Sequence, residues 1–269
     1  KLHIKTLKKI NNDTWKRRLL KLKKANSEVT IAIIGKYIEL QDSYKSISES
    51  LIHASALLEC SVNIKWIHSE RINNRNVEKY IKGCDGVLVA PGFGDRGIEG
   101  KIKAVQYVRE HNIPFLGICL GMQIAVIEFF RNVCGYKSAH STEMNKSTRY
   151  PVIDLMKNQE NIVDKGGTMR LGSYHCKIIK NSKSFLSYRK ECVEERHRHR
   201  YELNNKYRDI LTNKGMILAG VNEELDLVEI IEIPDHPWFV GVQFHPEFQS
   251  TFINPHPLFV SFLKSILIK

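Results

Sequence analysis

The sequence predicts an α/β fold, a doubly wound and mostly parallel sheet with flanking helices and an added antiparallel hairpin region. From Val29 onward, short apolar or β-branched runs alternate with segments whose apolar residues recur at helical spacing. Strands that alternate with helices in this way form parallel sheets with right-handed crossovers. After about Pro151, short apolar runs are separated by turns, which is the pattern of antiparallel hairpins.

The first half of the chain contains four predicted strands and the helices between them. The strands are the apolar runs 29–35, 62–67, 86–89 and 114–118. Asp42 or Ser43 can cap the first helix, and further helices are predicted through Tyr80, from about Glu99 to His111, and from Met122 to Arg131. The active groups of such sheets collect beyond the carboxyl ends of the strands, so the chemistry is expected there.

The second half of the chain contains the predicted antiparallel region. Its strands are the short apolar runs 168–172, 216–221, 228–233 and 239–244. A closing helix is predicted from Pro257, because apolar residues follow it at helical spacing. The sequence shows no internal repeat, so one domain over residues 29–269 is expected.

The positive charge of the chain is concentrated at its start. The 269 residues carry a formal net charge of +12, and ten basic residues lie between Lys1 and Lys24 against the single acid Asp13. Such a stretch is typical of an RNA-binding arm, a membrane-surface helix or a linker. Because it has no periodic aromatic platform and no groove-reading motif, we interpret residues 1–28 as a basic linker from a missing N-terminal domain. We therefore expect no nucleic acid and no membrane as partners.

The cysteines do not form a recognisable framework. None has C-x-x-C spacing, and the sequence shows no signal peptide and no long apolar segment. These observations argue against a zinc site, a disulfide framework and a membrane span, and they favour a cytoplasmic protein without a metal. The six cysteines are Cys60, Cys84, Cys119, Cys134, Cys176 and Cys192.

One of these cysteines stands between two glycines, where an apolar strand gives way to a helix. The segment Gly117-Ile118-Cys119-Leu120-Gly121 is the thiol version of a nucleophile elbow. Such a turn forces the nucleophile into a strained conformation, so its neighbours must lack a β-carbon. The positive end of the following helix activates the thiol and can hold an oxyanion. The alternative is a buried structural cysteine.

A thiolate that attacks an amide needs a base, and the base needs an orienting group. His245 follows the apolar run 240–242, and the next residue but one is Glu247. The proline between them stiffens the backbone, so that the carboxylate can reach back to the imidazole. His236 and His256 also precede prolines, and we interpret them as turn residues. The predicted catalytic set is therefore Cys119, His245 and Glu247.

The reaction also needs two backbone donors for the oxyanion. The N–H of Leu120, at the start of the helix, is one candidate. The N–H of Gly92 is the other, because Gly92 and Gly94 end the neighbouring strand and glycine lets main chain approach a substrate. The alternative for these glycines is an ordinary turn at the end of a strand.

These motifs carry a family resemblance. Cys119 in GICLGMQ, with His245 and Glu247 in FHPEF, resembles the class I (triad) glutamine amidotransferases. Longer runs are similar to the glutaminase domain of the CTP synthase family, and the resemblance covers nearly everything from Val29 to the C-terminal helix. It identifies residues 29–269 as a glutamine amidotransferase (glutaminase) domain. The runs are GKYIELQDSYKSISESL (35–51), GFGDRGIEGKI (92–102), GGTMRLG (166–172), ERHRHRYELN (195–204) and VGVQFHPEFQS (240–250).

The resemblance implies a role for each matching residue. Cys119 would form a glutamyl thioester, His245 would move protons to and from it, and Glu247 would hold His245. A carboxylate that binds the substrate α-ammonium selects an amino acid over a simple amide, which suits Glu143. Without the resemblance, the run 196–200 would be interpreted as a solvated strand or a metal-binding tract. The implied glutamine-binding residues are Gly92, Leu120, Gln123, Glu143 and Arg198.

The resemblance also implies what the chain lacks. In the family, ammonia passes to an N-terminal amidoligase domain, where ATP with Mg phosphorylates UTP and ammonia displaces the phosphate. No G-x-x-x-x-G-K-[ST] loop occurs in the sequence, so the chain alone is not expected to bind ATP or make CTP. GTP is the implied allosteric activator, and the full-length enzyme is expected to be a homotetramer. The matching activator positions, half of a site, are Phe93, Arg96, Glu99 and Arg170.

The sequence departs from the family at one position and leaves two alternatives open. Pro91 stands where the family usually has a glycine, and it has no N–H to donate. Other triad amidotransferases carry P-G-x-G here, so a working oxyanion hole with Gly92 as donor is expected. The first alternative function is a γ-glutamyl hydrolase or another amidotransferase's glutaminase subunit. The second is a catalytically silent scaffold or a basic nucleic-acid-binding module.

Overall fold

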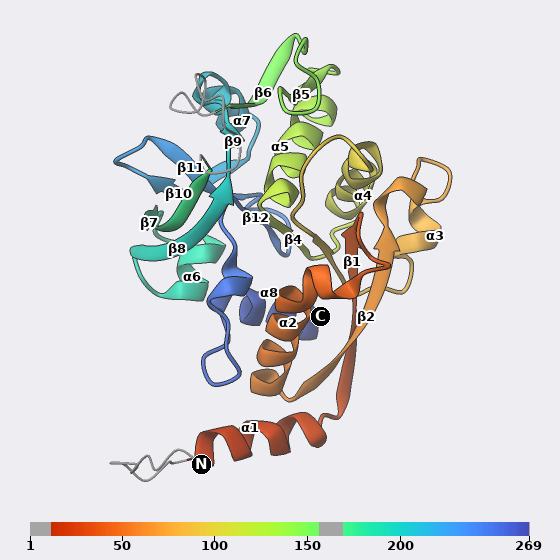
Figure 1. Cartoon of the computed structure of the whole chain (residues 1–269), viewed down its shortest axis with the longest axis vertical. Helices are drawn as coiled ribbons and strands as arrows, with labels where there is room; N and C mark the ends of the chain where they lie inside the picture. Colours follow the sequence, from red (N-terminus) through yellow and green to blue (C-terminus); the bar gives the residue numbers. More distant parts are fainter. Residues whose placement is uncertain (1–11, 156–168, 269) are drawn as a thin grey trace, which may run out of the picture.

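The computed structural model describes residues 12–155 and 169–268, and it confirms the predicted α/β class (Figure 1). The first half contains α1 (Asp13–Lys23), β1 (Ser27–Gly35), α2 (Lys45–Leu58), β2 (Cys60–His68), α3 (Val77–Ile81), β3 (Gly86–Val89), α4 (Ile98–Glu110), β4 (Phe115–Ile118) and α5 (Leu120–Asn132). The second half contains β5 (Ala139–Ser141), β6 (Tyr150–Leu155), β7 (Arg170–Ile178), α6 (Lys183–Tyr188), β8 (Cys192–His199), β9 (Tyr201–Leu203), α7 (Arg208–Asn213), β10 (Ile217–Asn222), β11 (Leu227–Glu232), β12 (Phe239–Val242) and α8 (Pro257–Leu267).

Nine strands of the described chain form one sheet, in the order β2-β1-β3-β4-β12-β11-β10-β7-β8. The strands from β2 to β12 are parallel, as predicted from the alternation of strands and helices. The strands from β11 to β8 are antiparallel to their neighbours, which confirms the predicted hairpin region. The hairpin region is therefore continuous with the parallel sheet, and β12 joins the two parts.

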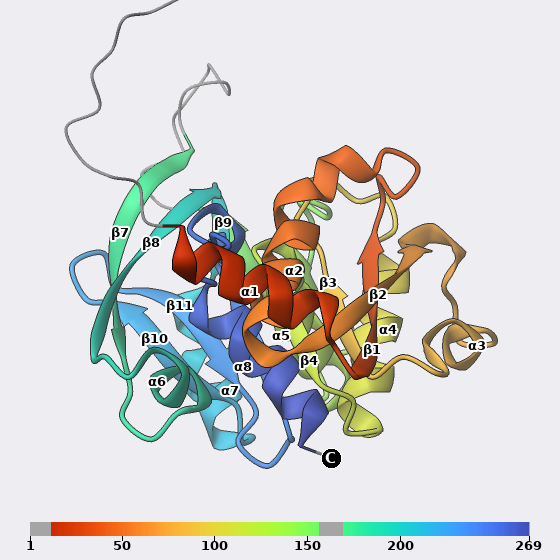
Figure 2. The ribbon, with the colours of Figure 1, turned by 90° about the horizontal axis from the view of Figure 1, so that it is seen from below.

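Helices cover both faces of this sheet, so its central strands are buried on both sides (Figures 1 and 2). On one face, α3, α4, α5 and α7 enclose a core that includes Phe115, Phe130 and Phe239. On the other face, α2 and α8 enclose a core that includes Phe259 and Phe262. The parallel strands consequently have continuous apolar sequences, whereas the edge strand β8 alternates between exposed and buried residues.

A second, smaller group of strands lies beyond the carboxyl ends of the central strands. Among the described residues, β5, β6 and β9 pair in the order β5-β6-β9. Their pairing is parallel between β5 and β6 and antiparallel between β6 and β9. The sequence did not predict this group, because its strands are short and two of them hold only three residues. It places residues 139–155 next to α5, where Arg131, near the C-terminal end of the helix, donates to the Ala139 carbonyl.

The predicted cap of the first domain helix is wrong. A 3₁₀ turn at Gln41–Tyr44 precedes α2, and Tyr44 at its N-cap makes no side-chain capping bond. Instead, the buried Tyr44 hydroxyl accepts hydrogen bonds from the N–H groups of Lys36 and Tyr37 at 3.2 and 3.3 Å. Asp42 and Ser43 line a cavity and do not cap the start of the helix.

The described part of the basic lead-in is a helix that lies against the domain (Figure 2). In α1, Trp15 contacts Phe252 with ring centroids 5.1 Å apart, and Arg18 Nη1 donates to the Phe252 carbonyl at 2.9 Å. Lys21 pairs with Glu59 at the end of α2 at 2.7 Å. Residues 1–11 of the predicted linker lie outside the described residues. No helix within residues 12–155 or 169–268 has the length and hydropathy that a bilayer span requires.

Candidate active site

The elbow predicted from the two glycines is present. Cys119 has φ 52° and ψ −103° and is the N-cap residue of α5, directly after β4. A β-carbon on Gly121 would stand 2.3 Å from the Val89 carbonyl oxygen, and one on Gly117 would stand 2.7 Å from the Gly121 carbonyl carbon. Both glycines are therefore required by close packing of main chain. Because Cys119 begins a helix, its sulfur lies beside the free N-terminal amides of α5.

The base of the predicted triad reaches Cys119 from the neighbouring strand. The N–H of Cys119 donates to the Val242 carbonyl at 2.7 Å, and this bond extends the parallel pairing of β4 with β12. His245 follows β12 three residues later, and its N–H donates to the Arg196 carbonyl of β8 at 2.8 Å. The sheet order therefore brings together a cysteine and a histidine that are far apart in the sequence.

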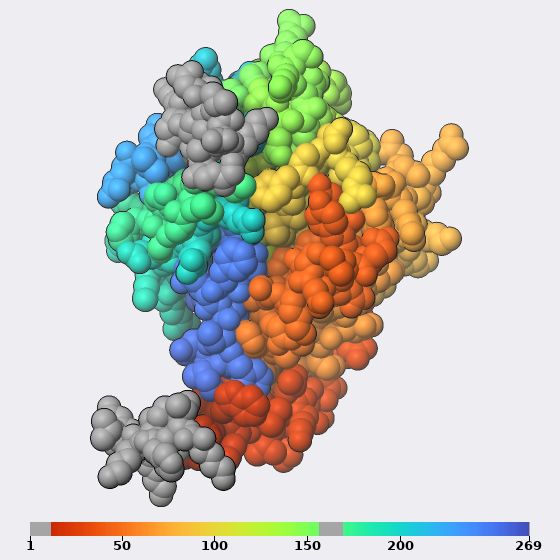
Figure 3. Space-filling model, in the orientation of Figure 1, coloured from red at the N-terminus to blue at the C-terminus, as the bar shows by residue number. Residues whose placement is uncertain are grey.

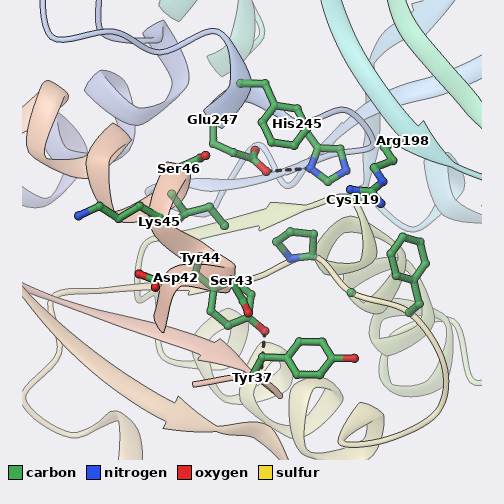
Figure 4. Close-up of a pocket in the computed structure, with 15 residues that line it drawn as sticks. Tyr37, Asp42, Ser43, Tyr44, Lys45, Ser46, Cys119, Arg198, His245 and Glu247 are labelled. Carbon is green, nitrogen blue, oxygen red and sulfur yellow. Dashed lines mark hydrogen bonds and ion pairs between the residues drawn. The ribbon is translucent and has the colours of Figure 1, made fainter. Parts of the chain in front are cut away.

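The imidazole of His245 is fixed on two sides. Its Nδ1 lies 2.8 Å from Glu247 Oε1, and its ring stacks on Phe248 with centroids 5.0 Å apart and planes 10° apart. Figure 4 shows Glu247 on one side of this ring and Cys119 on the other. The predicted set of Cys119, His245 and Glu247 is thus assembled, and the two side chains of the base and its orienting group are almost completely buried.

The electrostatics of the triad favour a charged imidazole. Burial of His245 disfavours its protonation, but the negative charge of Cys119 and the hydrogen bond that Glu247 accepts from Nδ1 outweigh that effect. Together they raise the pKa of His245 to about 10. A protonated base beside the sulfur is the state that stabilises a thiolate and can then give its proton to a leaving amine.

A cavity of about 260 Å³ opens beside the triad. It is bounded by the segments after β1, β3 and β12, which meet on one face of the molecule as orange, yellow and blue in Figure 3. Gly92 and Arg198 line it together with the triad, whereas Arg196 of β8 and Arg200, which follows β8, do not. A β-carbon on Gly92 would point toward Leu120, Lys101 and Lys36 at ordinary contact distances of 3.5 to 3.8 Å.

The other predicted glutamine-binding residues lie just behind this cavity. Gln123 is buried, and its Nε2 donates to the Tyr201 carbonyl at 2.7 Å and to Gln243 Oε1 at 3.2 Å. Glu143 follows β5, and its Oε1 accepts the Gly94 N–H at 2.8 Å. Burial raises the pKa of Glu143, while the Gly94 N–H, Lys36 and Arg200 act in the opposite direction.

Three of the predicted activator positions lie on the loop after β3 and the first turn of α4, whereas the fourth, Arg170, begins β7. Phe93 lines the cavity mouth and is 46% exposed. Arg96 pairs with Glu70 at 3.0 Å, and Glu99 pairs with Arg131 at 2.9 Å. Arg170 differs from these, because its guanidinium is 4% exposed. It pairs with Glu229 at 2.7 Å and stacks over the Tyr174 ring, so it does not face solvent in this structure.

The first four residues of the alternating run at 196–200 belong to the edge strand β8, and Arg200 follows it. Its arginines Arg196 and Arg198 are exposed, whereas His197 and His199 point to the interior, where His197 Nδ1 and His199 Nε2 lie 2.9 Å apart. Burial, the Arg170 guanidinium and, more weakly, His245 lower the pKa values of both histidines, that of His199 to about 3. Their environment is therefore that of a neutral buried pair, and of the arginines between and beside them only Arg198 lines the cavity.

Four functional side chains were missed by the reasoning from sequence. Gln243 Nε2 lies 3.7 Å from Cys119 Sγ, and Phe248 supports the His245 ring. Lys36 and Lys101 hold the loop that carries Gly92, as described below. Gln243 and Phe248 flank the His-Pro-Glu motif and could have been found from that position. The sequence around the two lysines does not indicate that they are buried. Because buried lysines are rare, both would be expected at the surface.

Comparisons with known proteins agree with this geometry. The sequence model of the family "Glutamine amidotransferase class-I" matches residues 39–265. The chain is 60% identical over 255 residues to a CTP synthase of Christiangramia forsetii, and 56% identical over 265 residues to one of Cytophaga hutchinsonii. These alignments cover 95% and 98% of this chain but 47% and 49% of the relatives. The chain therefore spans about half the length of the curated relatives it matches.

Solved structures show the same relationship. The glutaminase domain of Trypanosoma brucei CTPS, with bound acivicin, superimposes with a TM-score of 0.84 at 38% identity, covering 90% of this chain and 94% of that one. A putative GMP synthase protein of Thermoplasma acidophilum superimposes with a TM-score of 0.54 at 15% identity, covering 89% of this chain and 92% of that one. At that identity the likeness shows a shared fold alone.

Proposed function

The chain belongs to the class-I glutamine amidotransferase family, among the glutaminase domains of CTP synthases, and from that premise we propose that it hydrolyses L-glutamine through a thioester on Cys119. The observation that carries this proposal is the triad beside an open cavity. Cys119 begins a helix in a strained turn, and His245 is fixed against it by Glu247. A structural cysteine would need neither the turn nor the base.

The reaction follows from the positions of these groups. The thiolate of Cys119 attacks the side-chain amide carbon of glutamine, and the carbonyl oxygen takes up the negative charge. We propose that the N–H groups of Gly92 and Leu120 donate to that oxygen. The carbon–nitrogen bond then breaks, and His245 gives its proton to the leaving nitrogen, so that ammonia departs and a thioester remains. His245 next takes a proton from water, whose oxygen attacks the thioester to release glutamate and the free thiol.

Substrate selection is assigned to the residues around the cavity. We propose that Arg198, which lines the cavity, pairs with the substrate α-carboxylate, and that Glu143 accepts a hydrogen bond from the α-ammonium. One oxygen of Glu143 already holds Gly94, so the second oxygen is the one available to the substrate. Gln123 supports the site indirectly through Tyr201 and Gln243.

The ammonia is proposed to be used by another part of a longer protein. The curated relatives are about twice the length of this chain, and they are CTP synthases. We propose that an N-terminal amidoligase domain aminates UTP to CTP with ATP and Mg, that GTP activates the glutaminase, and that the full-length enzyme is a homotetramer. A cytoplasmic location is also proposed, because none of the six cysteines is in a disulfide.

The decisive experiment measures glutamate released from L-glutamine by this chain. Wild-type protein and a Cys84→Ser control, altered at a half-buried thiol outside the site, should release glutamate at equal rates. Cys119→Ser should release none above background. Equal release by wild type and Cys119→Ser would contradict the proposed function, as would the absence of release by folded wild type in the presence of its amidoligase partner.

A further inference from the structure

Two buried lysines hold the loop that carries the oxyanion donor Gly92. Lys101, in the first turn of α4, has a completely buried side chain, and its Nζ donates to the Ala90 carbonyl at 3.2 Å. Lys36 follows β1 and is 7% exposed, and its Nζ donates to the Phe93 carbonyl. The two ammonium groups therefore bind carbonyls on either side of Gly92.

This arrangement restrains the peptide groups around the donor. The peptide between Phe93 and Gly94 is held at both ends, because Lys36 binds its carbonyl and Glu143 accepts its N–H at 2.8 Å. On the other side of Gly92, Lys101 binds the carbonyl of Ala90, and Pro91 has a fixed φ. These contacts fix the peptide groups that flank the Pro91–Gly92 peptide, and they thereby limit how far the Gly92 N–H can turn from the cavity.

Burial of the Lys101 ammonium costs folding free energy, so we expect a functional reason for its position. A lysine is almost never completely buried without a charged partner, and the group that accepts from its ammonium here is a neutral carbonyl. The ammonium lies close beneath the loop, because a β-carbon on Gly92 would be 3.8 Å from Lys101 Nζ. Burial and the charge of Lys36 lower the pKa of Lys101 to about 7, whereas negative charge on Cys119 favours its protonated form.

We propose that Lys101 is a positioning residue of the glutaminase, which fixes the Gly92 N–H toward the substrate oxygen and places a positive charge beneath the developing oxyanion. Lys36 fixes the other side of the same loop. The inference rests on the proposed function, since it assigns these lysines to the same thioester reaction. Negative charge appears during that reaction first on Cys119 and then on the oxyanion, and a buried cation favours both states without contacting the substrate.

The test replaces the ammonium and keeps the volume. Lys101→Met should lower kcat for glutamine about 10- to 100-fold, which is less than the roughly 100- to 1,000-fold cost of removing an oxyanion donor, because the Gly92 N–H is still present. The KM for glutamine should change by less than about threefold, because the substrate's α-groups are bound elsewhere. The melting temperature should stay equal or rise, since an apolar residue of similar size replaces a buried charge. Lys103→Met, on the same helix but bonded to Gln106, is the matched control and should behave as wild type.

A second measurement reports on the oxyanion itself. A glutamine analogue with an aldehyde in place of the amide adds to Cys119 and forms a tetrahedral oxyanion that resembles the transition state. Its affinity for Lys101→Met should fall by about the same factor as kcat/KM, whereas the affinity for the product glutamate should stay constant. Lys36→Met should likewise weaken binding of the aldehyde and leave binding of glutamate unchanged, which keeps the test available should Lys101→Met fail to fold.

Several outcomes would overturn the inference. Wild-type kcat in Lys101→Met would do so, as would a loss of activity that parallels a fall in melting temperature with no selective loss of aldehyde affinity. Unchanged aldehyde affinity in Lys36→Met would remove the second lysine from the account. The proposed function is tested separately, because it depends on glutamate release by wild type and its loss in Cys119→Ser.

Discussion

Glu143 accepts a hydrogen bond from the Gly94 N–H at 2.8 Å, and thereby joins the segment after β5 to the loop after β3. The same carboxylate is the group proposed to bind the substrate α-ammonium. Its two oxygens therefore serve two purposes, one structural and one in recognition. Substitutions that remove the charge alone, or the charge and the hydrogen bond together, separate these purposes.

Glu143→Gln should raise the KM for glutamine by about tenfold or more and leave kcat within about threefold of wild type. The amide oxygen can still accept from Gly94, but the charge that binds an ammonium is lost. Glu143→Ala should lower kcat as well, because the loop loses one of its restraints. Steady-state kinetics of both variants measure the split, and a large fall of kcat in Glu143→Gln would refute it.

Substitutions of Cys119 and Glu247, the two outer members of the triad, should reduce activity to different extents. Cys119→Ser should abolish glutamate release, whereas Glu247→Gln should fold normally and slow hydrolysis much less. The reason is that Phe248 still stacks on the His245 ring, and an amide oxygen at residue 247 can still accept from Nδ1. Glutamate release and circular dichroism of both variants provide the measurement. Equal losses of activity would show that the carboxylate does more than orient His245.

Chemical labelling should distinguish Cys119 from the other thiols. A glutamine analogue with an electrophilic side chain should modify Cys119 alone, because recognition by the cavity precedes the reaction. Burial raises the pKa values of Cys60, Cys84, Cys134 and Cys176, which makes these thiols poor nucleophiles.

Cys192 is the informative control, since it is the exposed cysteine of the chain and iodoacetamide should reach it readily. Peptide mapping after treatment with the glutamine analogue, and separately with iodoacetamide, shows which cysteines each reagent modifies. An adduct of the glutamine analogue on Cys192, or on any of the four less reactive thiols, would contradict recognition by the cavity.

The buried histidine pair should make the folded state sensitive to acid. The folded pKa of His199 is lowered to about 3 from an unfolded value of 6.5, so below pH 6.5 the unfolded chain binds a proton that the folded chain excludes. Stability is therefore lost as pH falls from about 6.5 toward 3. Full exclusion of one proton between pH 6.5 and 5.0 corresponds to about 2 kcal/mol of unfolding free energy.

Urea unfolding at pH 7.0 and pH 5.0 measures this effect. His199→Gln should reduce the difference in unfolding free energy between the two pH values by about 1–2 kcal/mol. His175→Gln, which alters an exposed histidine of β7, should leave that difference unchanged. The comparison with wild type is needed because Glu202 and Glu229, whose pKa values burial raises to about 8 and about 7, act with the opposite sign. An unchanged difference in His199→Gln would refute the prediction.

GTP should have almost no effect on this chain by itself. Arg170, one of the proposed activator positions, is buried and turned inward onto Glu229. A nucleotide shifts activity only if it binds the active state more tightly than the inactive one, and half of a site provides little such difference. Glutamate release is measured with and without GTP at ~1 mM, which saturates any site of micromolar affinity. Stimulation as strong as in the full-length enzyme would place the activator site wholly within these residues.

The parallel half of the fold was predictable because its information is local. The strand at 86–89 is an apolar run between turn residues, and its predicted limits are those of β3. The elbow was predictable for the same reason, since Gly117 and Gly121 lie within five residues that include the whole turn. The position of His245 beside Cys119 was inferred from chemistry alone, and it depends on β12 pairing with β4.

What could not be predicted depends on contacts between distant segments. The run RHRHR alternates with the period of a strand, but only its pairing with β7 shows that the histidines face inward and the arginines outward. Lys101 has the sequence context of a surface residue on an amphipathic helix, and its burial follows from how α4 packs against β3. The strand expected at 168–172 begins at Arg170 in the structure, and its first residue lies outside the described residues.

The order of the strands also sets when the protein becomes active during its synthesis. The nucleophile directly follows β4, but the strand that supplies its base is added to the sheet only after four antiparallel strands have been made. A nascent chain that has emerged from the ribosome as far as β11 holds Cys119 without His245 or Glu247. We therefore expect unfinished polypeptides to leave cellular glutamine intact, and ammonia to be released only once residues 245–247 have left the exit tunnel.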